Sequence, residues 1–296
     1  MPSLSYWRAR STVKYKLKGV NSFHRSFGSV EMDNNEYVAG IDIGAVTAKF
    51  VILHKNLIVA REVVPTGASG KVAPYRVMEA ALRKANLSLE DISYVVATGY
   101  GRISVPFANK QVTEITCHAR GAYFLVPSVK AIIDIGGQDS KVIKLGDGGK
   151  VIDFAMNDKC AAGSGRFLEV MAGALEEKVE NMGRLSLKSK NRIEISSTCT
   201  VFAESEVVTH IAAGVSTEDI IAGVHYSVAA RVSGLFKSRI RDKFNEAEVI
   251  MTGGVAQNIG VVKALEEKLG RKIVVPPDPQ IVGALGAALI AKEQMS

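Results

Sequence analysis

The sequence predicts an α/β protein built from an internal duplication, and two copies of one short pattern support that prediction. Residues 39–53 and 131–145 each place an Asp-Ile-Gly segment between apolar and β-branched runs. Three pairs of residues recur at one offset of 92 positions: Asp42 with Asp134, Gly44 with Gly136, and Lys49 with Lys141. A single Asp-Ile-Gly is typical of an ordinary hairpin, but two copies in register, each followed by a short polar turn, favour a duplication.

Each copy predicts a strand, a tight glycine turn and an antiparallel return strand. Glycine lets the backbone approach a bound group closely, and successive N–H groups of such a turn can point at one anion. An aspartate at the entry of the turn can hold a hydrated Mg²⁺ ion, which prefers oxygen ligands. The pattern therefore favours a phosphate tail with its metal, facing Asp42 and Asp134.

The remaining segments alternate between strand and helix patterns, as an α/β fold requires. We expect strands at 38–43, 49–53, 57–64, 92–97, 150–156, 193–196, 248–251 and 273–275. We expect helices at 71–86, 111–124, 167–175, 198–212, 216–240 and 281–292. Thr217 is the expected N-cap of the long helix. Small-residue loops follow two strands, at Thr98–Gly101 and Thr252–Val255, where ligand-binding loops of α/β sheets tend to lie.

The chain divides into three predicted parts. Residues 1–35 form a basic extension, 36–128 a first domain, and 129–296 a second domain whose C-terminal helix crosses back to the first. The first 30 residues hold six basic side chains and no acidic one, so they account for most of the net charge of +7. We expect this extension to be disordered; its composition is also compatible with an organelle transit segment or with a start assigned upstream of Met32.

Composition narrows the classes of function. A chain of 296 residues with 47% hydrophobic and 23% charged residues is typical of a soluble globular protein with ample core. No apolar run approaches the length of a membrane span, and the charge outside the extension is nearly balanced. We therefore expect no membrane and no nucleic acid as partner. Three cysteines are too few for a secreted disulfide framework, which favours the reducing cytoplasm.

Two of the three cysteines lie before or at the start of predicted helices. Cys160 lies in the loop before the third expected helix, and Cys199 opens the fourth. The helix dipole at such positions lowers the pKa of a thiol and favours the thiolate, which is the form that binds metal. Two thiolates cannot complete a four-cysteine iron–sulfur cluster, but two copies of the chain around a two-fold axis can.

A purely structural role for both thiols is the alternative. Cys117 has only that role in our prediction, because it lies among apolar residues of an expected helix. Its neighbour His118 points about 100° away around a helix, so the two do not form a natural ligand pair.

Four segments resemble the signature segments of the BadF/BadG/BcrA/BcrD ATPase family: Ile132–Asp139, Met156–Phe167, Ser196–Glu206 and Met251–Asn258. The resemblance extends from Tyr37 to the C-terminus and is best to the activator components of 2-hydroxyacyl-CoA dehydratases. It implies a duplicated RNase H-like fold of the actin, hexokinase and Hsp70 type, with an ATP cleft between two domains. It also implies ATP hydrolysis coupled to one-electron transfer from a [4Fe–4S] cluster to a dehydratase. The cluster would be shared by a homodimer and reduced by a ferredoxin- or flavodoxin-type donor.

The resemblance also implies roles for individual residues. Cys160 and Cys199 match the cluster ligands of the family. Asp42 and Asp134 would face Mg²⁺, while Gln138, Glu204 or Glu206 would orient the attacking water. The expected nucleotide-binding residues are Gly44, Ala45, Val46, Thr47, Ala48, Lys49, Gly136, Gly137, Gly253, Gly254, Gln257, Gln280 and Gly283.

One departure from the family pattern concerns the first glycine turn. The family places Ser or Thr directly after Asp-x-Gly, whereas this chain has Ala45 and Val46. One side-chain donor to phosphate is therefore lost or is supplied by Thr47.

Other functions stay open at this point. The chain is compatible with the ATPase subunit of a benzoyl-CoA reductase-type ring reductase, and with a sugar or small-acid kinase of the same fold. A nucleotide sensor without turnover is a further alternative. The kinase and the sensor would lack iron, whereas the activator and the ring-reductase subunit would not.

Overall fold

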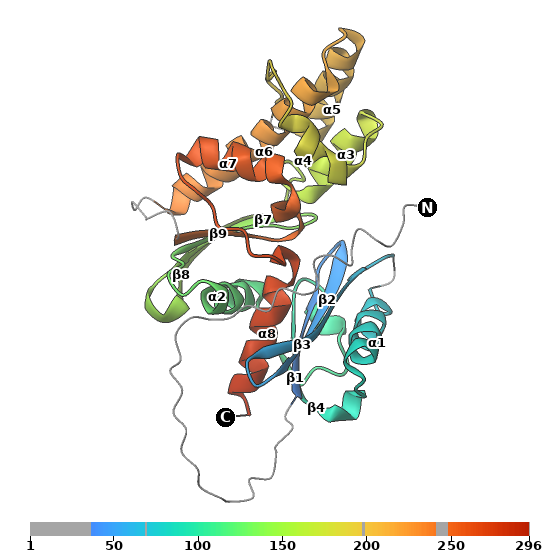
Figure 1. Ribbon diagram of the computed structural model, residues 1–296, viewed down its shortest axis with the longest axis vertical. Coiled ribbons are helices and arrows are strands. Elements are labelled where there is room, and N and C mark those ends of the chain that lie inside the picture. The colour runs from blue at the N-terminus through green and yellow to red at the C-terminus, as the bar shows by residue number, and fades with distance from the viewer. Residues whose placement is uncertain (1–36, 69, 197–198, 241–247, 296) are drawn as a thin grey trace, which may run out of the picture. The chain divides into compact units, whose positions relative to one another are not determined.

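The computed structural model describes residues 37–68, 70–196, 199–240 and 248–295, so the predicted extension 1–35 lies outside the described residues. Residues Asn35–Ser296 form one compact unit that contains two sheets (Figure 1). The predicted boundary between residues 128 and 129 stays a prediction. None of the described helices is long and apolar enough to cross a membrane.

The first sheet has the strand order β3-β2-β1-β4-β5. Its strands are β1 (Tyr37–Ile43), β2 (Thr47–His54), β3 (Leu57–Pro65), β4 (Ile92–Thr98) and β5 (Lys110–Gln111). Strands β1, β2 and β3 are antiparallel neighbours, while β4 is parallel to β1. Alternate residues point to opposite faces, as the strand period requires. Ile41 and Phe50 pack toward α1 (Ala73–Ala85), and Val51 packs toward α8 (Val282–Glu293).

The second sheet repeats this arrangement with the strand order β8-β7-β6-β9. Its strands are β6 (Ala131–Ile135), β7 (Ser140–Leu145), β8 (Val151–Asn157) and β9 (Val249–Thr252). Strands β6, β7 and β8 are again antiparallel neighbours, and β9 is parallel to β6 as β4 is to β1. The equivalent hairpins β1–β2 and β6–β7 are those that the 92-residue offset predicts.

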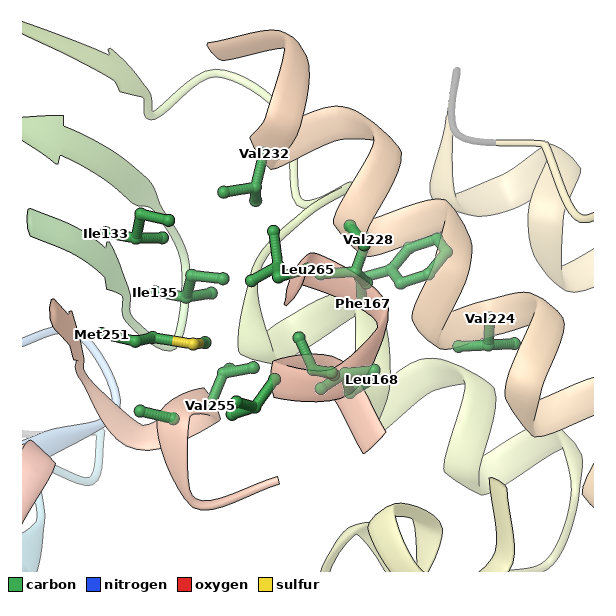
Figure 2. Packing of buried hydrophobic residues seen from close by; sticks show 14 of the residues in the cluster. Ile133, Ile135, Phe167, Leu168, Val224, Val228, Val232, Met251, Val255 and Leu265 are labelled. Carbon is green, nitrogen blue, oxygen red and sulfur yellow. The ribbon is translucent and has the colours of Figure 1, made fainter. Parts of the chain in front are cut away.

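Helices cover both faces of the second sheet (Figure 1). On one face lie α6 (Thr217–Arg239), α3 (Gly165–Ala174) and α7 (Ile259–Leu269), and α2 (Glu114–Leu125) lies on the other. Figure 2 shows Ile133, Ile135 and Met251 pointing from their strands toward Phe167 and Val228. The burial of these branched and aromatic side chains positions α3 and α6 against the sheet, since about 25 cal/mol is gained per Å² of apolar surface removed from water.

Two further helices lie beyond this layer, α4 (Val179–Ser186) and α5 (Thr200–Ala212). Short 3-10 turns occupy Leu89–Asp91, Arg102–Ser104, Asp147–Gly149, Gly254–Gln257 and Pro279–Ile281. The sequence did not predict α4, and Gln111, predicted as the first residue of a helix, instead belongs to β5. Gln257 is the last residue of the 3-10 turn before α7.

The predicted strand 193–196 is wrong, because these residues form no regular secondary structure. Side chains bond the backbone of its last residue, Ser196. Ser196 N–H donates to Glu206 Oε2 at 2.6 Å, and Ser196 C=O accepts from Ser227 Oγ at 3.1 Å. The predicted strand 273–275 is likewise reduced to one bridge between Ile250 and Val274.

Two predicted helix starts also differ. The N-cap of α6 is Ser216, whose hydroxyl accepts from Asp219 N–H at 3.2 Å, and Thr217 is the first helical residue. Helix α3 begins at Gly165, so Cys160 lies five residues before it, in a turn rather than at the helix start. Cys199, in contrast, is the N-cap residue of α5, as the sequence predicts.

Candidate functional site: two aspartate–glycine turns in contact

Asp42 lies at the end of β1, where only 6% of it is exposed. Across the hairpin it faces Lys49, whose Nζ lies 3.1 Å from Asp42 Oδ2. On the other side its neighbour in β4 is Thr98. The register of the three strands thus places one carboxylate between a cationic and a hydroxyl-bearing residue.

Asp134 occupies the equivalent position in the second sheet. Its partner across the hairpin is Lys141, with Nζ 3.4 Å from Asp134 Oδ2, and Thr252 Oγ donates to Asp134 Oδ1 at 2.8 Å. His118 of α2 adds its Nδ1 at 3.5 Å from Oδ1. Burial alone would raise the pKa of Asp134, but His118, Lys141 and the Thr252 hydrogen bond outweigh it and lower the pKa to about 2. The carboxylate is therefore ionised at neutral pH.

Lys141 is the centre of a buried ion cluster. Only 2% of this residue is exposed, and its Nζ lies 2.7 Å from Asp139 and 3.5 Å from Glu114, in addition to Asp134. Burial lowers the pKa of Lys141, but the three carboxylates raise it above its usual range, so the ammonium keeps its charge. The pKa of Glu114 is raised, mainly by burial.

The two glycine turns have the same backbone geometry. Gly44 N–H donates to Thr47 C=O at 3.0 Å, and Gly136 N–H donates to Asp139 C=O at 3.0 Å. Both donors and both acceptors are 92 positions apart. The first turn therefore makes the same hydrogen bond as the second, with Ala45 and Val46 after its glycine.

The turns also touch each other. A Cβ atom on Gly137 would lie only 2.3 Å from Val46 Cγ2, so the second turn packs directly on the first. Ala45 and Gln138 are exposed on these turns, and Thr47 is half-buried. Ala48 points into the core under α1 and offers no side chain to a ligand.

Glycines after the parallel strands bring their backbone close to both aspartates. Gly99 and Gly253 each have φ +85°, a conformation that L side chains rarely adopt. A Cβ atom would lie 2.3 Å from Asp42 Oδ1 at Gly99 and 2.9 Å from Asp134 Oδ1 at Gly253. Only glycine is compatible with both the backbone and the neighbouring carboxylate.

The start of α8 and the ring of His118 connect the two halves. A Cβ atom on Gly283 would lie 2.9 Å from His118 Nε2 and 3.4 Å from Asp42 Oδ2. Because His118 Nδ1 is near Asp134, one imidazole lies beside the Asp134 carboxylate and beside the helix start that faces Asp42.

A second group of predicted residues gathers next to this centre. Gln257 Nε2 donates to Gln280 Oε1 at 3.1 Å, and Gln280 Nε2 would lie 3.2 Å from a Cβ on Gly254. Gly253 N–H donates to Pro279 C=O at 2.9 Å. Contacts between neighbouring residues therefore connect this second group to Asp134, so that most of the predicted nucleotide-binding residues lie in one region.

Glu204 and Glu206 belong to a different region. Both lie on α5, which packs on α3 and α6, and Glu204 is exposed. Glu206 accepts the hydrogen bond from Ser196 N–H, so its carboxylate holds the segment before Cys199. Of the three residues expected to orient water, only Gln138 lies on a glycine turn.

The three cysteines differ in accessibility. Cys160 and Cys199 are partly exposed, whereas Cys117 is fully buried, and burial raises the pKa of its thiol to about 12. Within the part of the chain that the structure describes, no three His, Cys, Asp or Glu side chains group as a metal site.

Sequence reasoning missed several residues of the centre. The sequence could have indicated Lys141, because this residue matches Lys49 at the 92-residue offset. It could also have indicated Thr252, because a Thr-Gly pair is repeated after a parallel strand. Nothing in the sequence indicated His118, because its distance from Asp134 along the chain does not show that α2 brings the two residues together.

A duplicated hairpin sheet with two aspartate–glycine turns in contact defines a nucleotide-binding protein of the actin, hexokinase and Hsp70 type, with the duplicated RNase H-like fold. A ROK hexokinase from Thermus thermophilus shares this fold alone, with a TM-score of 0.52 at 16% identity over 88% of this chain and 100% of that one. The chain belongs to the BadF/BadG/BcrA/BcrD ATPase family, whose model matches residues 39–291.

Relatives in this family are similar over nearly their whole length. An activator of 2-hydroxyisocaproyl-CoA dehydratase from Clostridioides difficile is 51% identical over 259 residues, 87% of this chain and 96% of that protein. An activator of lactoyl-CoA dehydratase from Anaerotignum propionicum is 52% identical over 259 residues, 87% and 98% of the two chains. The solved structure of the 2-hydroxyisocaproyl-CoA dehydratase activator from Clostridium difficile, with bound ADPNP, has a TM-score of 0.83 at 49% identity, covering 87% of this chain and 95% of that one.

Proposed function

We propose that this protein is an ATP-dependent activator of a 2-hydroxyacyl-CoA dehydratase, which couples ATP hydrolysis to one-electron transfer from a [4Fe–4S] cluster to the dehydratase. The observation that carries the proposal is the pair of contacting aspartate–glycine turns in a chain with two partly exposed cysteines, one in the turn before α3 and one at the N-cap of α5. Relatives named as dehydratase activators, about half identical in sequence, support the same activity.

The turns would bind the phosphates of ATP with their backbone N–H groups, and Asp42 and Asp134 would face Mg²⁺ and its waters. The two buried carboxylates at the turn entries fit this ion, which usually takes one or two carboxylates besides phosphate and water. Lys49, which is paired with Asp42, would supply a positive charge to the phosphates. Gln138, exposed on the second turn, is the proposed residue that orients the attacking water.

Gly253, Gly254, Gln257 and Gln280 would receive the nucleoside. The 3-10 turn Gly254–Gln257 brings backbone close to this region, and the hydrogen-bonded pair Gln257–Gln280 offers amide donors and acceptors to a base or ribose. Gly283 would allow the start of α8 to approach the same nucleotide.

Cys160 and Cys199 would be this chain's ligands to the cluster. Their partial exposure fits the role, and the buried Cys117 does not share it. When bound, the cluster would supply a one-electron carrier whose potential depends on its surroundings. Asn157, Ser196 and Glu206 hold the backbone around the two thiols.

Because one chain offers two suitable thiols, we propose a homodimer in which two copies share one cluster. Helix α5 has an apolar surface suited to such an interface, with Val201 and Phe202 both 65% exposed and Val208 54% exposed. The site of the cluster then lies on the two-fold axis, as an isologous dimer requires.

The remaining partners are proposed from the same activity. A ferredoxin- or flavodoxin-type protein would reduce the cluster, and the dehydratase would accept the electron. Reduced thiols and a low-potential electron fit the cytoplasm, and we propose no nucleic acid and no membrane as partner.

The test combines the oxygen-free protein with a 2-hydroxyacyl-CoA dehydratase, a reductant and ATP with Mg²⁺. We expect dehydration only when ATP and reductant are both present. Cys160→Ser should abolish activation but leave ATP binding intact, whereas Cys117→Ala should activate normally. Phosphorylation of a sugar or small acid by a colourless sample would contradict the proposal and favour the kinase alternative.

A further inference from the structure

The turn that carries Cys160, residues 158–164, leads directly into the start of α3, which is bonded to the second glycine turn. Gly165 N–H donates to Gly136 C=O at 2.8 Å, and Arg166 N–H donates to Gly137 C=O at 2.7 Å. These are the first two N–H groups of α3, which have no partner within the helix. The glycine turn therefore caps α3 in place of a side chain. A Cβ on Gly165 would lie 3.1 Å from Gly136 O and 3.3 Å from Gly137 Cα, so the two backbones are in close contact.

Asn157 makes a second connection between the same two segments. It is the last residue of β8, and its neighbour across the sheet is Ser140, which directly follows the second glycine turn. Its Nδ2 donates to Cys160 C=O and to Ala162 C=O, both at 2.9 Å. Only the amide nitrogen can serve two carbonyls, which fixes the orientation of the carboxamide.

Two hydrogen bonds inside the Cys160 turn, residues 158–164, limit its internal motion. Ser164 donates to Ala161 C=O twice, from its N–H at 2.9 Å and from its hydroxyl at 2.7 Å. A displacement of Gly136 or Gly137 would therefore move the Cys160 turn as one piece instead of being absorbed inside it.

Cys199 is held differently. The backbone before it is bonded through Ser196 to Glu206 of α5 and Ser227 of α6. None of these described partners belongs to a glycine turn. The two cysteines should thus respond differently to a ligand at the second turn.

We infer that Asn157 is a positioning residue that transmits the state of the second glycine turn to Cys160. The inference rests on the proposed function, because it requires the phosphates of a nucleotide to bind at that turn. Phosphate bound by the N–H groups of residues 137–139 shifts the carbonyls of Gly136 and Gly137 with them, and α3 follows. Asn157 keeps the Cys160 and Ala162 carbonyls aligned with the sheet during this shift, so the sulfur changes position relative to Cys199.

The test measures the alkylation rate of each cysteine by iodoacetamide in the full-length, iron-free protein. Peptide mass spectrometry resolves Cys160 from Cys199 in one sample, with and without a non-hydrolysable ATP analogue. In the unmutated protein we expect the analogue to change the Cys160 rate about three- to tenfold, the effect of one or two hydrogen bonds, and to leave the Cys199 rate nearly unchanged.

Asn157→Asp is the informative variant, because it keeps the size of the side chain and replaces the donor with an acceptor facing two carbonyls. We expect the nucleotide effect on Cys160 to disappear while calorimetry still detects binding of the analogue. Asn181→Asp, the same change on the surface of α4, should behave like the unmutated protein. Urea unfolding confirms that both variants are folded, and Asn157→Ser replaces Asn157→Asp if the latter is not.

Two results would overturn the inference while the proposed function survives. One is bound analogue with no change at Cys160 in the unmutated protein, and the other is a full nucleotide effect in a folded Asn157 variant. Failure of the analogue to bind at all would refute the nucleotide site of the proposed function, and the inference with it.

Discussion

The two pairs Asp42–Lys49 and Asp134–Lys141 are equivalent in the chain but differ in their surroundings. The Lys49 side chain is 14% exposed and has one carboxylate partner within the described contacts. The Lys141 side chain is 2% exposed and has three. Lysine is rarely buried without such compensation, so this ammonium holds three carboxylates that would otherwise repel one another.

We therefore predict that Lys141→Met lowers the free energy of unfolding by roughly 3–5 kcal/mol, because it leaves buried carboxylates uncompensated. Lys49→Met is the matched control and should cost distinctly less. Urea unfolding at pH 7 measures both. Equal losses for the two variants would show that the carboxylates around Lys141 are not a coupled cluster.

Gly283 provides a prediction about ligand affinity. An added methyl group would lie 2.9 Å from His118 Nε2 and 3.4 Å from Asp42 Oδ2. Gly283→Ala should weaken ATP binding roughly tenfold, the effect of about 1.4 kcal/mol of crowding. Calorimetry measures this.

The control is Gly173→Ala, in α3, where no atom lies within 4 Å of the added Cβ. It should leave affinity unchanged and raise stability by about 0.5–1 kcal/mol through helix propensity. Unchanged affinity in Gly283→Ala would place the nucleotide away from the start of α8.

His225 predicts a pH dependence of stability. It is buried in α6, where its Nε2 accepts from Asn258 Nδ2 at 3.2 Å, and burial lowers its pKa from 6.5 to about 3. The unfolded chain takes up a proton below pH 6.5 while the native state does not, so stability falls as the pH drops from 6.5 toward 3.

Between pH 6.5 and pH 4 this effect amounts to roughly 3 kcal/mol. His225→Gln should flatten that part of the profile in urea unfolding, and His210→Gln on α5 serves as the control. A steep profile that persists in His225→Gln would assign the acid sensitivity to other groups.

At the scale of elements, the N-cap of α6 is Ser216, whereas the sequence predicted its neighbour Thr217. Ser216 and Thr217 are both good caps by residue type, but only Ser216 accepts from Asp219 N–H. Ser216→Ala should destabilise the protein by about 1 kcal/mol, and Thr217→Ala by less than about 0.5 kcal/mol. The reverse order in thermal or urea unfolding would contradict this assignment of the helix start.

The sequence could predict most strands and helices because their apolar residues repeat with the period of the element. Ile132 and Ile133 illustrate this, since adjacent residues of β6 pack on opposite helical layers. Residues 193–196 show the limit. Ile193 and Ile195 have the alternation of a strand, but none of the described strands pairs with them, and Ser227 and Glu206 bond the backbone of Ser196 instead. The presence of a neighbouring strand is not readable from local pattern.

The parts of the candidate site that occur twice in the chain could be predicted from the sequence. The 92-residue offset located both aspartates, both glycine turns and, in Lys141, one residue that we did not assign. Contacts between distant segments were not predictable in the same way. His118 reaches Asp134 only because α2 packs under the second sheet, and Glu206 proved to hold the segment before Cys199 rather than to lie beside the glycine turns.

At the scale of the whole molecule, two half-sites meet within one chain, and two half-sites would meet between two chains. The glycine turns meet inside one chain, through Val46 and Gly137. The thiols Cys160 and Cys199 would complete their site only with a second copy. The hydrogen bonds from Gly165 and Arg166 to the second glycine turn connect the two levels.

The most direct test is the iron, sulfide and mass of an oxygen-free preparation, measured on one sample by metal analysis and sedimentation. The account predicts a dimer with about four irons and four sulfides per two chains. Cys160→Ser and Cys199→Ser should each lose the iron, and Cys117→Ala should keep it. A monomer without iron, or a full cluster held by each separate chain, would contradict the claim that two copies of this protein share one cofactor.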